Sequence, residues 1–217
     1  MIRGAIFDLD GVLVTTDEYH YRAWKRMAER HGIPYDRSVQ ERQRGVSRMA
    51  SLELMLEPLD REFTDAEKQA MADEKNGYYR ESLQELSEGD VLPGARETLR
   101  GLRERGVKTA IASSSRNAPT INERLGFDAL VDATVDGNDI EHSKPHPEVF
   151  LLSAERLGLE PAVCLVVEDA QAGIDAARRA AMAALGIGSP DELTGADRVV
   201  GSLAEIAVDE LLALGGR

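Results

Sequence analysis

The sequence predicts an α/β fold, in which a parallel sheet carries helices on both faces and a small α-helical cap domain is inserted. Two observations predict it. Short apolar, β-branched runs alternate with longer segments whose apolar residues recur at helical spacing. One segment, residues 17–87, breaks this alternation, because it contains no convincing strand. We therefore expect an α/β core of residues 1–16 and 88–217, with residues 17–87 forming the cap domain.

The expected elements follow one another along the chain. The strands cover residues 5–7, 107–112, 129–135, 163–167, 183–187 and 199–200. The inserted segment shows helical patterns at residues 18–30, 38–43, 49–57 and 65–86, and a capping box at Thr64 and Glu67 opens the last. Glycines stand where helices should end, at Gly32, Gly106, Gly126 and Gly158. This order predicts a Rossmann-like sheet, with a site beyond the carboxyl ends of its strands.

Composition narrows the class of protein. The 217 residues can bury a real core, and the net charge of -13 opposes binding to nucleic acid or anionic lipid. A phosphate site must therefore be locally basic. No apolar run approaches the roughly 20 residues needed to cross a membrane, and Asp8 and Asp10 interrupt the apolar start of the chain. Cys164, the single cysteine, lies in an expected strand and is interpreted as an inert core thiol. We expect a cytoplasmic protein.

Two acidic pairs stand at the ends of expected strands. Asp8 and Asp10 end the first strand and precede Gly11, and Glu168 and Asp169 end a later one. Each pair alone could cap a turn or a helix. In one parallel sheet, however, the two strand ends converge and bring three or four carboxylates to one edge. Oxygen ligands of this kind suit Mg²⁺.

Hydroxyl and cationic residues follow other strands. Residues 113–117, Ser-Ser-Ser-Arg-Asn, end a strand and open a helix, where hydroxyls and free N–H groups can cradle an anion. Lys144 precedes Pro145 and offers a compact positive charge to a phosphoryl oxygen. On its own, Lys144 would be interpreted as a solvated surface lysine. Beside the acidic pairs, a phosphate-binding role is favoured.

The whole set of motifs resembles that of the haloacid dehalogenase superfamily: Asp8-Leu9-Asp10-Gly11, then Ser113, Lys144 and Glu168-Asp169. Within it the chain resembles the β-phosphoglucomutases. That resemblance rests on residues 7–12, 18–25, 45–48, 51–52, 75–76, 79, 112–119, 143–145 and 168–174. The cap residues are the diagnostic part, because phosphatases share the core motifs. Arg44 and Arg116 depart from the pattern, standing where lysines are expected, and their forked guanidinium would hold phosphate with a different geometry.

The resemblance implies a role for each site residue. Catalysis would use Asp8 as nucleophile, Asp10 as general acid and base, Ser113 and Lys144. One Mg²⁺ per subunit would be held by the Asp8 side chain, the Asp10 carbonyl and Asp169, with Glu168 close by. Thr16 would be a hinge. The substrate-binding residues would be His20, Trp24, Arg44, Gly45, Val46, Ser47, Arg48, Ser51, Lys75, Ser113, Ser114, Ser115, Arg116, Asn117 and Lys144.

Three functions compete. The first is a magnesium-dependent isomerase that interconverts β-D-glucose 1-phosphate and D-glucose 6-phosphate, with β-glucose 1,6-bisphosphate as intermediate and activator. The second is a sugar-phosphate or phosphoglycolate-type phosphatase on the same scaffold. The third is a catalytically silent binding protein, which the intact acidic motifs argue against. The expected partners are small-molecule sugar phosphates, with no nucleic acid and no membrane. The chain is expected to be a monomer. His31, His142 and His146 belong to no motif and receive no role.

Overall fold

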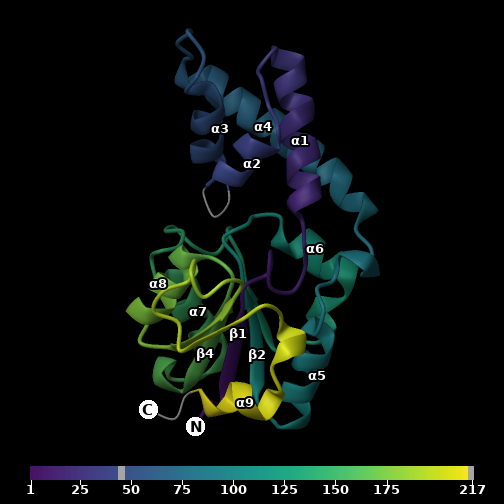
Figure 1. Ribbon diagram of the computed structural model, residues 1–217. Coiled ribbons are helices and arrows are strands. Elements are labelled where there is room, and N and C mark those ends of the chain that lie inside the picture. The colour runs from purple at the N-terminus through teal and green to yellow at the C-terminus, as the bar shows by residue number, and fades with distance from the viewer. Residues whose placement is uncertain (44–46, 215–217) are drawn as a thin grey trace. The chain divides into compact units, whose positions relative to one another are not determined.

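The computed structural model describes residues 1–43 and 47–214, and the chain divides into two compact units. The core unit consists of Met1–Thr15 and Leu86–Arg217, and the cap unit is Thr16–Glu85. Each unit has its own set of elements (Figure 1). Arg44, Gly45 and Val46, which are candidate substrate-binding residues, lie outside the described part of the chain.

The core unit contains a parallel six-stranded sheet, which confirms the predicted fold class. Its order is β3-β2-β1-β4-β5-β6. The strands are β1 Gly4–Phe7, β2 Lys108–Ala112, β3 Ala133–Val135, β4 Cys164–Glu168, β5 Ala183–Ile187 and β6 Arg198–Val200. From β1 the chain builds outward through β2 and β3, and then returns to place β4 on the other side of β1. The reversal makes the carboxyl ends of β1 and β4 the switch point at which ligands bind in such sheets.

Helices cover both faces of this sheet (Figure 1). On one face, α7 (Glu148–Leu157) and α8 (Gln171–Arg179) pack against alternate strand residues, so Phe150 and Ile174 share a buried cluster with Ile6, Ala110 and Val166. On the other face, α5 (Ala95–Glu104) packs against β2. Two further helices, α6 (Ala118–Leu125) and α9 (Val208–Ala213), complete the helical layers of the core unit. The buried sheet is therefore a rigid base for the strand ends.

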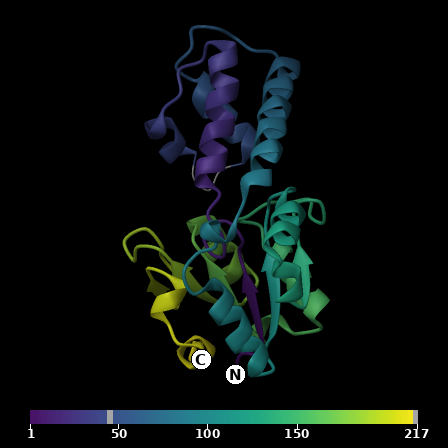
Figure 2. The same ribbon diagram turned by 90° about the vertical axis from the view of Figure 1, so that its right-hand side faces the viewer.

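The cap unit is a helical bundle. It comprises α1 (Asp17–His31), α2 (Arg37–Arg42), α3 (Arg48–Leu56) and α4 (Asp65–Ser82), and α1 and α4 run side by side (Figure 2). Their apolar faces meet in a separate core that includes Trp24, Met27, Leu52, Met55 and Met71. Within residues 1–43 and 47–214, no helix is both long and apolar enough to pass through a membrane.

Local predictions were confirmed at most element ends and wrong at two. The Thr64–Glu67 capping box forms, and Gly32, Gly126 and Gly158 end their helices in the left-handed conformation. The strand expected over residues 129–135 begins only at Ala133, because residues 127–129 close a 3₁₀ turn in which Leu130 N donates to the Phe127 carbonyl. The helix expected over residues 65–86 ends at Ser82 and tightens into a 3₁₀ turn, Leu83–Glu85.

Candidate active site

The site begins with Asp8, the first residue after β1. Because β1 lies between β2 and β4, Asp8 emerges at the middle of the sheet edge, and its backbone N–H donates to the Val167 carbonyl at 2.9 Å. Glu168 follows Val167 at the end of β4. Asp8 as a whole residue is only 7% exposed and Glu168 is 1% exposed. The two acids predicted at separate strand ends thus lie together in a mostly buried setting.

Lys144 reaches into this pair. Its Nζ donates to Asp8 Oδ1, to Glu168 Oε2 at 2.8 Å and to the Ala112 carbonyl at 3.3 Å. The same Nζ lies 4.9 Å from the ring centroid of Phe150, within cation–π range. All three donor positions of the ammonium therefore have acceptors. A buried ammonium held this way has little freedom to move, so Lys144 fixes the orientation of both carboxylates.

Two glycines make room for the acids. A Cβ on Gly173 would stand 2.0 Å from Glu168 Cδ, so the first turn of α8 admits the glutamate only because this residue has no side chain. A Cβ on Gly11 would stand 2.0 Å from Asp169 Oδ2, and Gly11 also has a φ of +82°, which glycine adopts without strain. The glycine after the first acidic pair is thus required both by the turn and by the second acidic pair.

Crowding of the acids changes their ionisation. Burial raises the pKa of Asp8 well above its usual range; the charge of Lys144 opposes this shift, and Glu168 and Asp169 add to it. Asp169 reaches the surface, yet the protein around it and neighbouring Glu168 raise its pKa to about 8. Burial lowers the pKa of Lys144, but the charges of Asp8 and Glu168 outweigh burial and shift it upward overall. The cluster holds more negative charge than one lysine can balance.

The donor set fits a hard divalent cation. Asp8, Glu168 and Asp169 each offer a carboxylate oxygen, and these oxygens lie within 4.8 Å of one another. With all three acids ionised, their charge of -3 and the +1 of Lys144 leave a net charge of -2. Oxygen-only ligands with a residual double negative charge suit Mg²⁺. A bound cation would also lower the raised pKa of Asp8, because it favours the ionised form.

Asp10 stands in the turn that follows Asp8. This turn is closed by hydrogen bonds from Gly11 N to the Val14 carbonyl at 2.8 Å and from Leu13 N to the Leu9 carbonyl at 2.9 Å. Asp10 also forms a bridge with Val14, so its backbone position is set by the turn, while the residue itself is only partly buried. A carboxylate on a fixed turn, partly open to solvent, can exchange a proton with a ligand.

The hydroxyl loop after β2 is built around its own backbone. The buried Ser113 Oγ accepts from Ser115 N at 3.1 Å, and Ser115 Oγ accepts from Asn117 N at 3.2 Å. Ser114 and Arg116 are exposed, and Asn117 is buried at the start of α6. The Arg116 Nε donates to the Gly137 carbonyl at 3.3 Å. The loop places Ser113 close to the strand end and leaves the Arg116 guanidinium at the surface.

The cap unit has a cluster of its own around Lys75. Its Nζ lies 2.8 Å from His20 Nδ1, and it also lies 4.9 Å and 4.8 Å from the ring centroids of Trp24 and Tyr79. The His20 ring stacks on Tyr79 at a centroid distance of 4.1 Å. Burial lowers the pKa of His20 well below its usual range, and the charges of Lys75 and Arg48 lower it further. His20 is therefore neutral, with Nδ1 accepting from the Lys75 ammonium.

Other candidate residues of the cap unit have local roles. Ser47 is the N-cap of α3, and its Oγ accepts from Ala50 N at 3.3 Å. Arg48 is the first residue of that helix and is partly buried, whereas Ser51 is buried. The buried Thr16 precedes α1 and its carbonyl accepts from His20 N at 3.0 Å. Arg48 therefore lies at a helix start in a unit that already concentrates positive charge near His20.

The fold and the cluster of Asp8, Glu168 and Asp169 at the carboxyl ends of the strands define an α/β enzyme with an inserted helical unit. The chain belongs to the haloacid dehalogenase-like hydrolase family, whose family model matches residues 2–181. A β-phosphoglucomutase of Bacillus subtilis is 41% identical over 212 residues, which is 97% of this chain and 94% of that protein. A β-phosphoglucomutase structure from Clostridium difficile has a TM-score of 0.90 and 38% identity, covering 100% of this chain and 98% of that one. A phosphorylated carbohydrates phosphatase of Thermotoga maritima is 33% identical over 82% of each chain.

The sequence did not reveal two contacts of Lys144 or a neighbouring cluster of histidines. Phe150 supplies the aromatic face beneath Lys144, and the Ala112 carbonyl supplies its third acceptor. Phe150 carried the ordinary pattern of a core helix residue, so nothing distinguished it from its neighbours.

His142 and His146, which received no role, lie with Glu148 in a cluster on the loop that carries Lys144. The spacing of the two histidines and the glutamate was the available signal.

Proposed function

We propose that this enzyme is a β-phosphoglucomutase that interconverts β-D-glucose 1-phosphate and D-glucose 6-phosphate. The observation that carries the proposal is that each unit places positively charged side chains in a partly or fully buried cluster. Lys144 serves the acidic edge of the core unit, and the cap unit concentrates Lys75 and Arg48 around a neutral His20. A phosphatase needs to neutralise one phosphate, whereas a mutase that passes through a sugar bisphosphate must hold two. The full-length similarity to β-phosphoglucomutases supports the same choice.

The chemistry would centre on Asp8. In the phosphorylated enzyme, the C6 hydroxyl of β-glucose 1-phosphate attacks the phosphorus of the aspartyl phosphate, and the Asp8 carboxylate leaves. β-Glucose 1,6-bisphosphate forms and reorients. Asp8 then attacks the phosphorus on C1, which releases glucose 6-phosphate and restores the aspartyl phosphate. Lys144 would hold one oxygen of Asp8 in place throughout and contribute positive charge beside the transferred group.

Asp10 would move the proton in both halves of the cycle. It would accept the proton of the attacking C6 hydroxyl and later donate a proton to the C1 oxygen as that oxygen leaves phosphorus. Its place on the turn that follows Asp8, with a partly exposed side chain, supports this role. The buried Ser113 on the neighbouring loop would donate a hydrogen bond to a phosphoryl oxygen.

Mg²⁺, which enzymes of this family generally use, would be held by Asp8, the Asp10 carbonyl and Asp169, with Glu168 close by. When bound, it would neutralise the repulsion between the Asp8 carboxylate and the phosphoryl group. In the cap unit, Arg48 would bind the phosphate that is not transferred, and His20, Trp24 and Lys75 would contact the sugar. In the core unit, the exposed Arg116 and the buried Asn117 would contribute to substrate binding.

The test measures two products of one reaction. Purified enzyme receives β-glucose 1-phosphate and Mg²⁺, glucose 6-phosphate is followed by a coupled assay, and inorganic phosphate is measured in parallel. A mutase should show a lag that added β-glucose 1,6-bisphosphate shortens, with phosphate appearing far more slowly than glucose 6-phosphate. The α-anomer should be a poor substrate, because its phosphate leaves the ring in another direction.

The second candidate is a sugar-phosphate phosphatase, and the similarity to the Thermotoga maritima phosphatase favours it specifically. In that case water replaces the sugar hydroxyl as the acceptor of the phosphoryl group. Phosphate release would then match or exceed isomerisation across several sugar phosphates, and bisphosphate would have no activating effect. This outcome would reject the mutase proposal.

A further inference from the structure

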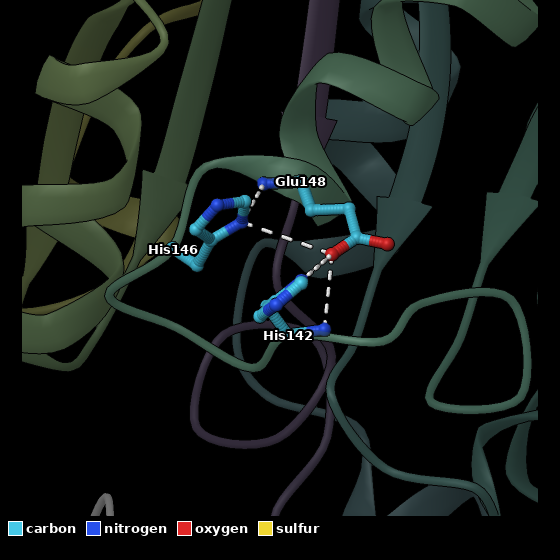
Figure 3. Close-up of side chains that lie close together, drawn as sticks. All are labelled: His142, His146 and Glu148. Atoms are coloured by element: carbon cyan, nitrogen blue, oxygen red, sulfur yellow. Dashed lines mark hydrogen bonds and ion pairs between the residues drawn. The ribbon is translucent and has the colours of Figure 1, made fainter.

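The loop that carries Lys144 also carries a compact cluster of two histidines and a glutamate. His142 and His146 lie two residues to either side of Lys144, and Glu148 is the first residue of α7. His142 Nδ1 lies 2.9 Å from Glu148 Oε2, and His146 Nδ1 lies 3.7 Å from the same oxygen. Figure 3 shows both imidazole rings turned toward this carboxylate. One ligand atom from each residue lies within 4.8 Å of the others.

The backbone holds the glutamate in place before any ligand binds. Glu148 Oε1 accepts from Glu141 N at 2.9 Å, and Oε2 accepts from His142 N at 2.9 Å. These bonds close the loop onto the start of α7 and fix the carboxylate between the two rings. Glu148 N donates to His146 Nδ1 at 3.3 Å, so this nitrogen carries a lone pair, and a bound ion would take that lone pair in place of the N–H. The carboxylate also offsets the positive end of the α7 dipole, which would otherwise repel a cation.

The rings are open to solvent, so an ion can reach them. The side chains of His142 and His146 are 61% and 51% exposed, and their centroids lie 4.6 Å apart with the planes tilted by 34°. Four tetrahedral ligands at the bond lengths of Zn²⁺ stand roughly 3.3 Å from one another. The observed separations of 2.9 and 3.7 Å bracket this value. Small rotations of the exposed rings would bring all three atoms to zinc distances.

We propose that His142, His146 and Glu148 form a second metal site, selective for Zn²⁺ or a similar transition-metal cation. Two imidazoles and one carboxylate suit such ions and disfavour Mg²⁺, which prefers oxygen ligands only. Water would complete the tetrahedron, and the proton now on His142 Nδ1 would pass to solvent when the ion binds. The two histidine ligands flank Lys144, so the bound ion would cross-link the chain on both sides of that residue.

The cap unit contains a natural control. His31 Nε2 lies 2.8 Å from Glu74 Oε2, which repeats the histidine–carboxylate pair of the proposed site. That pair has no second histidine, and Arg30 Nη1 lies 3.3 Å from the same carboxylate. A single imidazole beside a guanidinium is a poor cation site. If the proposal is correct, the two histidine–glutamate pairs must behave differently.

The experiment titrates Zn²⁺ into the full chain with Mg²⁺ in excess, which keeps the acidic site of the core unit occupied. The chain has four histidines, so ring nitrogens can be followed individually by ¹H–¹⁵N NMR. We expect the His142 and His146 rings to shift together at stoichiometric Zn²⁺, with His31 unmoved. Calorimetry should show the affinity falling by at least about tenfold in His142→Ala and in His146→Ala, and remaining unchanged in His31→Ala.

Co²⁺ provides an independent readout of geometry. Its visible absorption becomes intense in a tetrahedral site, and this band should be lost in His146→Ala. Three results would overturn the proposal: Zn²⁺ affinity that is the same in both histidine variants as in wild type, rings of His142 and His146 that do not move as Zn²⁺ binds, or a His31 ring that shifts at the same concentration. Because both side chains are exposed, either variant should retain the fold, which circular dichroism can verify.

Discussion

The core unit and the cap unit each bury a lysine, but they surround it with different partners. Lys144 of the core unit meets two carboxylates, Asp8 and Glu168. Lys75 of the cap unit, which is 2% exposed, meets the neutral ring of His20 and the faces of two aromatic rings. The two lysines thus differ in these contacts, which are carboxylates for Lys144 and a neutral acceptor and aromatic faces for Lys75.

The difference shows what each unit is suited to bind. Burial raises the pKa of Asp8, and the charges of Glu168 and Asp169 add to this shift against the opposing charge of Lys144. The acids around Lys144 outnumber the cation, so an additional cation is favoured. Burial lowers the pKa of His20, and the charges of Lys75 and Arg48 lower it further. Two cations beside a neutral ring favour an anion or a sugar oxygen. In a chain with a net charge of -13, the two neighbouring cations Lys75 and Arg48 supply the local positive charge that a phosphate would need.

The largest effect is expected from Asp8→Asn, which tests whether the acidic cluster performs the chemistry. An amide is a poor nucleophile and a weak Mg²⁺ ligand, so turnover of β-glucose 1-phosphate should fall by at least about 10³-fold. Glu168 remains to pair with Lys144, so circular dichroism and the melting temperature should change little. If a purified, contamination-free variant kept a tenth of wild-type kcat, Asp8 would not be the nucleophile.

The fold was largely predictable because its signals are local. Apolar runs ended by acids or glycines marked β1, β4 and β5, and glycines in the left-handed conformation ended α1, α6 and α7. The errors arose where local signals are ambiguous. Ala129 and Leu130 are apolar, but they belong to a 3₁₀ turn rather than to β3. The end of α4 tightens at Ser82, whose hydroxyl donates to the Tyr79 carbonyl at 2.8 Å.

The acidic edge could be inferred because parallel strands place their carboxyl ends together, so two acidic pairs at strand ends must converge. The contacts of the two lysines could not be inferred in this way. Lys75 meets His20 across 55 residues, and Lys144 meets Asp8 across 136. Neither separation leaves a periodic pattern in the sequence. These pairings depend on tertiary packing, which only the resemblance to a known family or the structure itself can supply.

The comparison of the two lysines can be tested by replacing each with methionine, which is unbranched like lysine but carries no charge and is one atom shorter. Lys144→Met should lower the free energy of unfolding by about 3–5 kcal/mol at pH 7 without divalent cation, because Asp8 and Glu168 lose their buried partner. Lys75→Met should cost about 1–2 kcal/mol, since it gives up a hydrogen bond and cation–π contacts in a cluster with aromatic faces. Urea unfolding measures both.

Equal losses for the two methionine variants would break the comparison, because they would mean that the cap lysine is as dependent on charge pairing as the core lysine. Lys68→Met serves as the matched control within the cap unit. Lys68 pairs with the exposed Glu53 at 2.8 Å, and such surface pairs contribute only about 0–1 kcal/mol. Its loss should therefore be the smallest of the three.

Arg48→Ala tests whether the cap unit binds a phosphate. A charge-assisted contact to a phosphate is worth roughly 2–5 kcal/mol when truncated, so kcat/KM for β-glucose 1-phosphate should fall strongly. Phosphorylation of the enzyme by acetyl phosphate, which carries no second phosphate, should fall far less. Arg42→Ala is the control, because Arg42 lies in the same unit and pairs with Glu57 at 2.7 Å on the surface. If activity with β-glucose 1-phosphate and with acetyl phosphate fell equally, Arg48 would support the fold or the catalytic centre and would not bind the second phosphate.

The smallest effect concerns the protonation of His20, and its sign follows from the depressed pKa. The unfolded chain binds a proton at His20 below pH of about 6.5, whereas the folded chain does not until a much lower pH. Lowering the pH through this range therefore favours the unfolded state, by at most about 1.4 kcal/mol per pH unit for one group. His20→Gln keeps an acceptor for Lys75 but cannot titrate, so the free energy of unfolding of this variant should depend less on pH between about 6.5 and 5.

Urea unfolding of the wild type and the variant at several pH values gives the two slopes, and ring NMR of the wild type should show His20 neutral across the range. If the His20 ring titrates near its usual pKa, or if the slopes agree, the cap cluster does not hold a neutral imidazole beside its cations, and the electrostatic contrast between the two units fails.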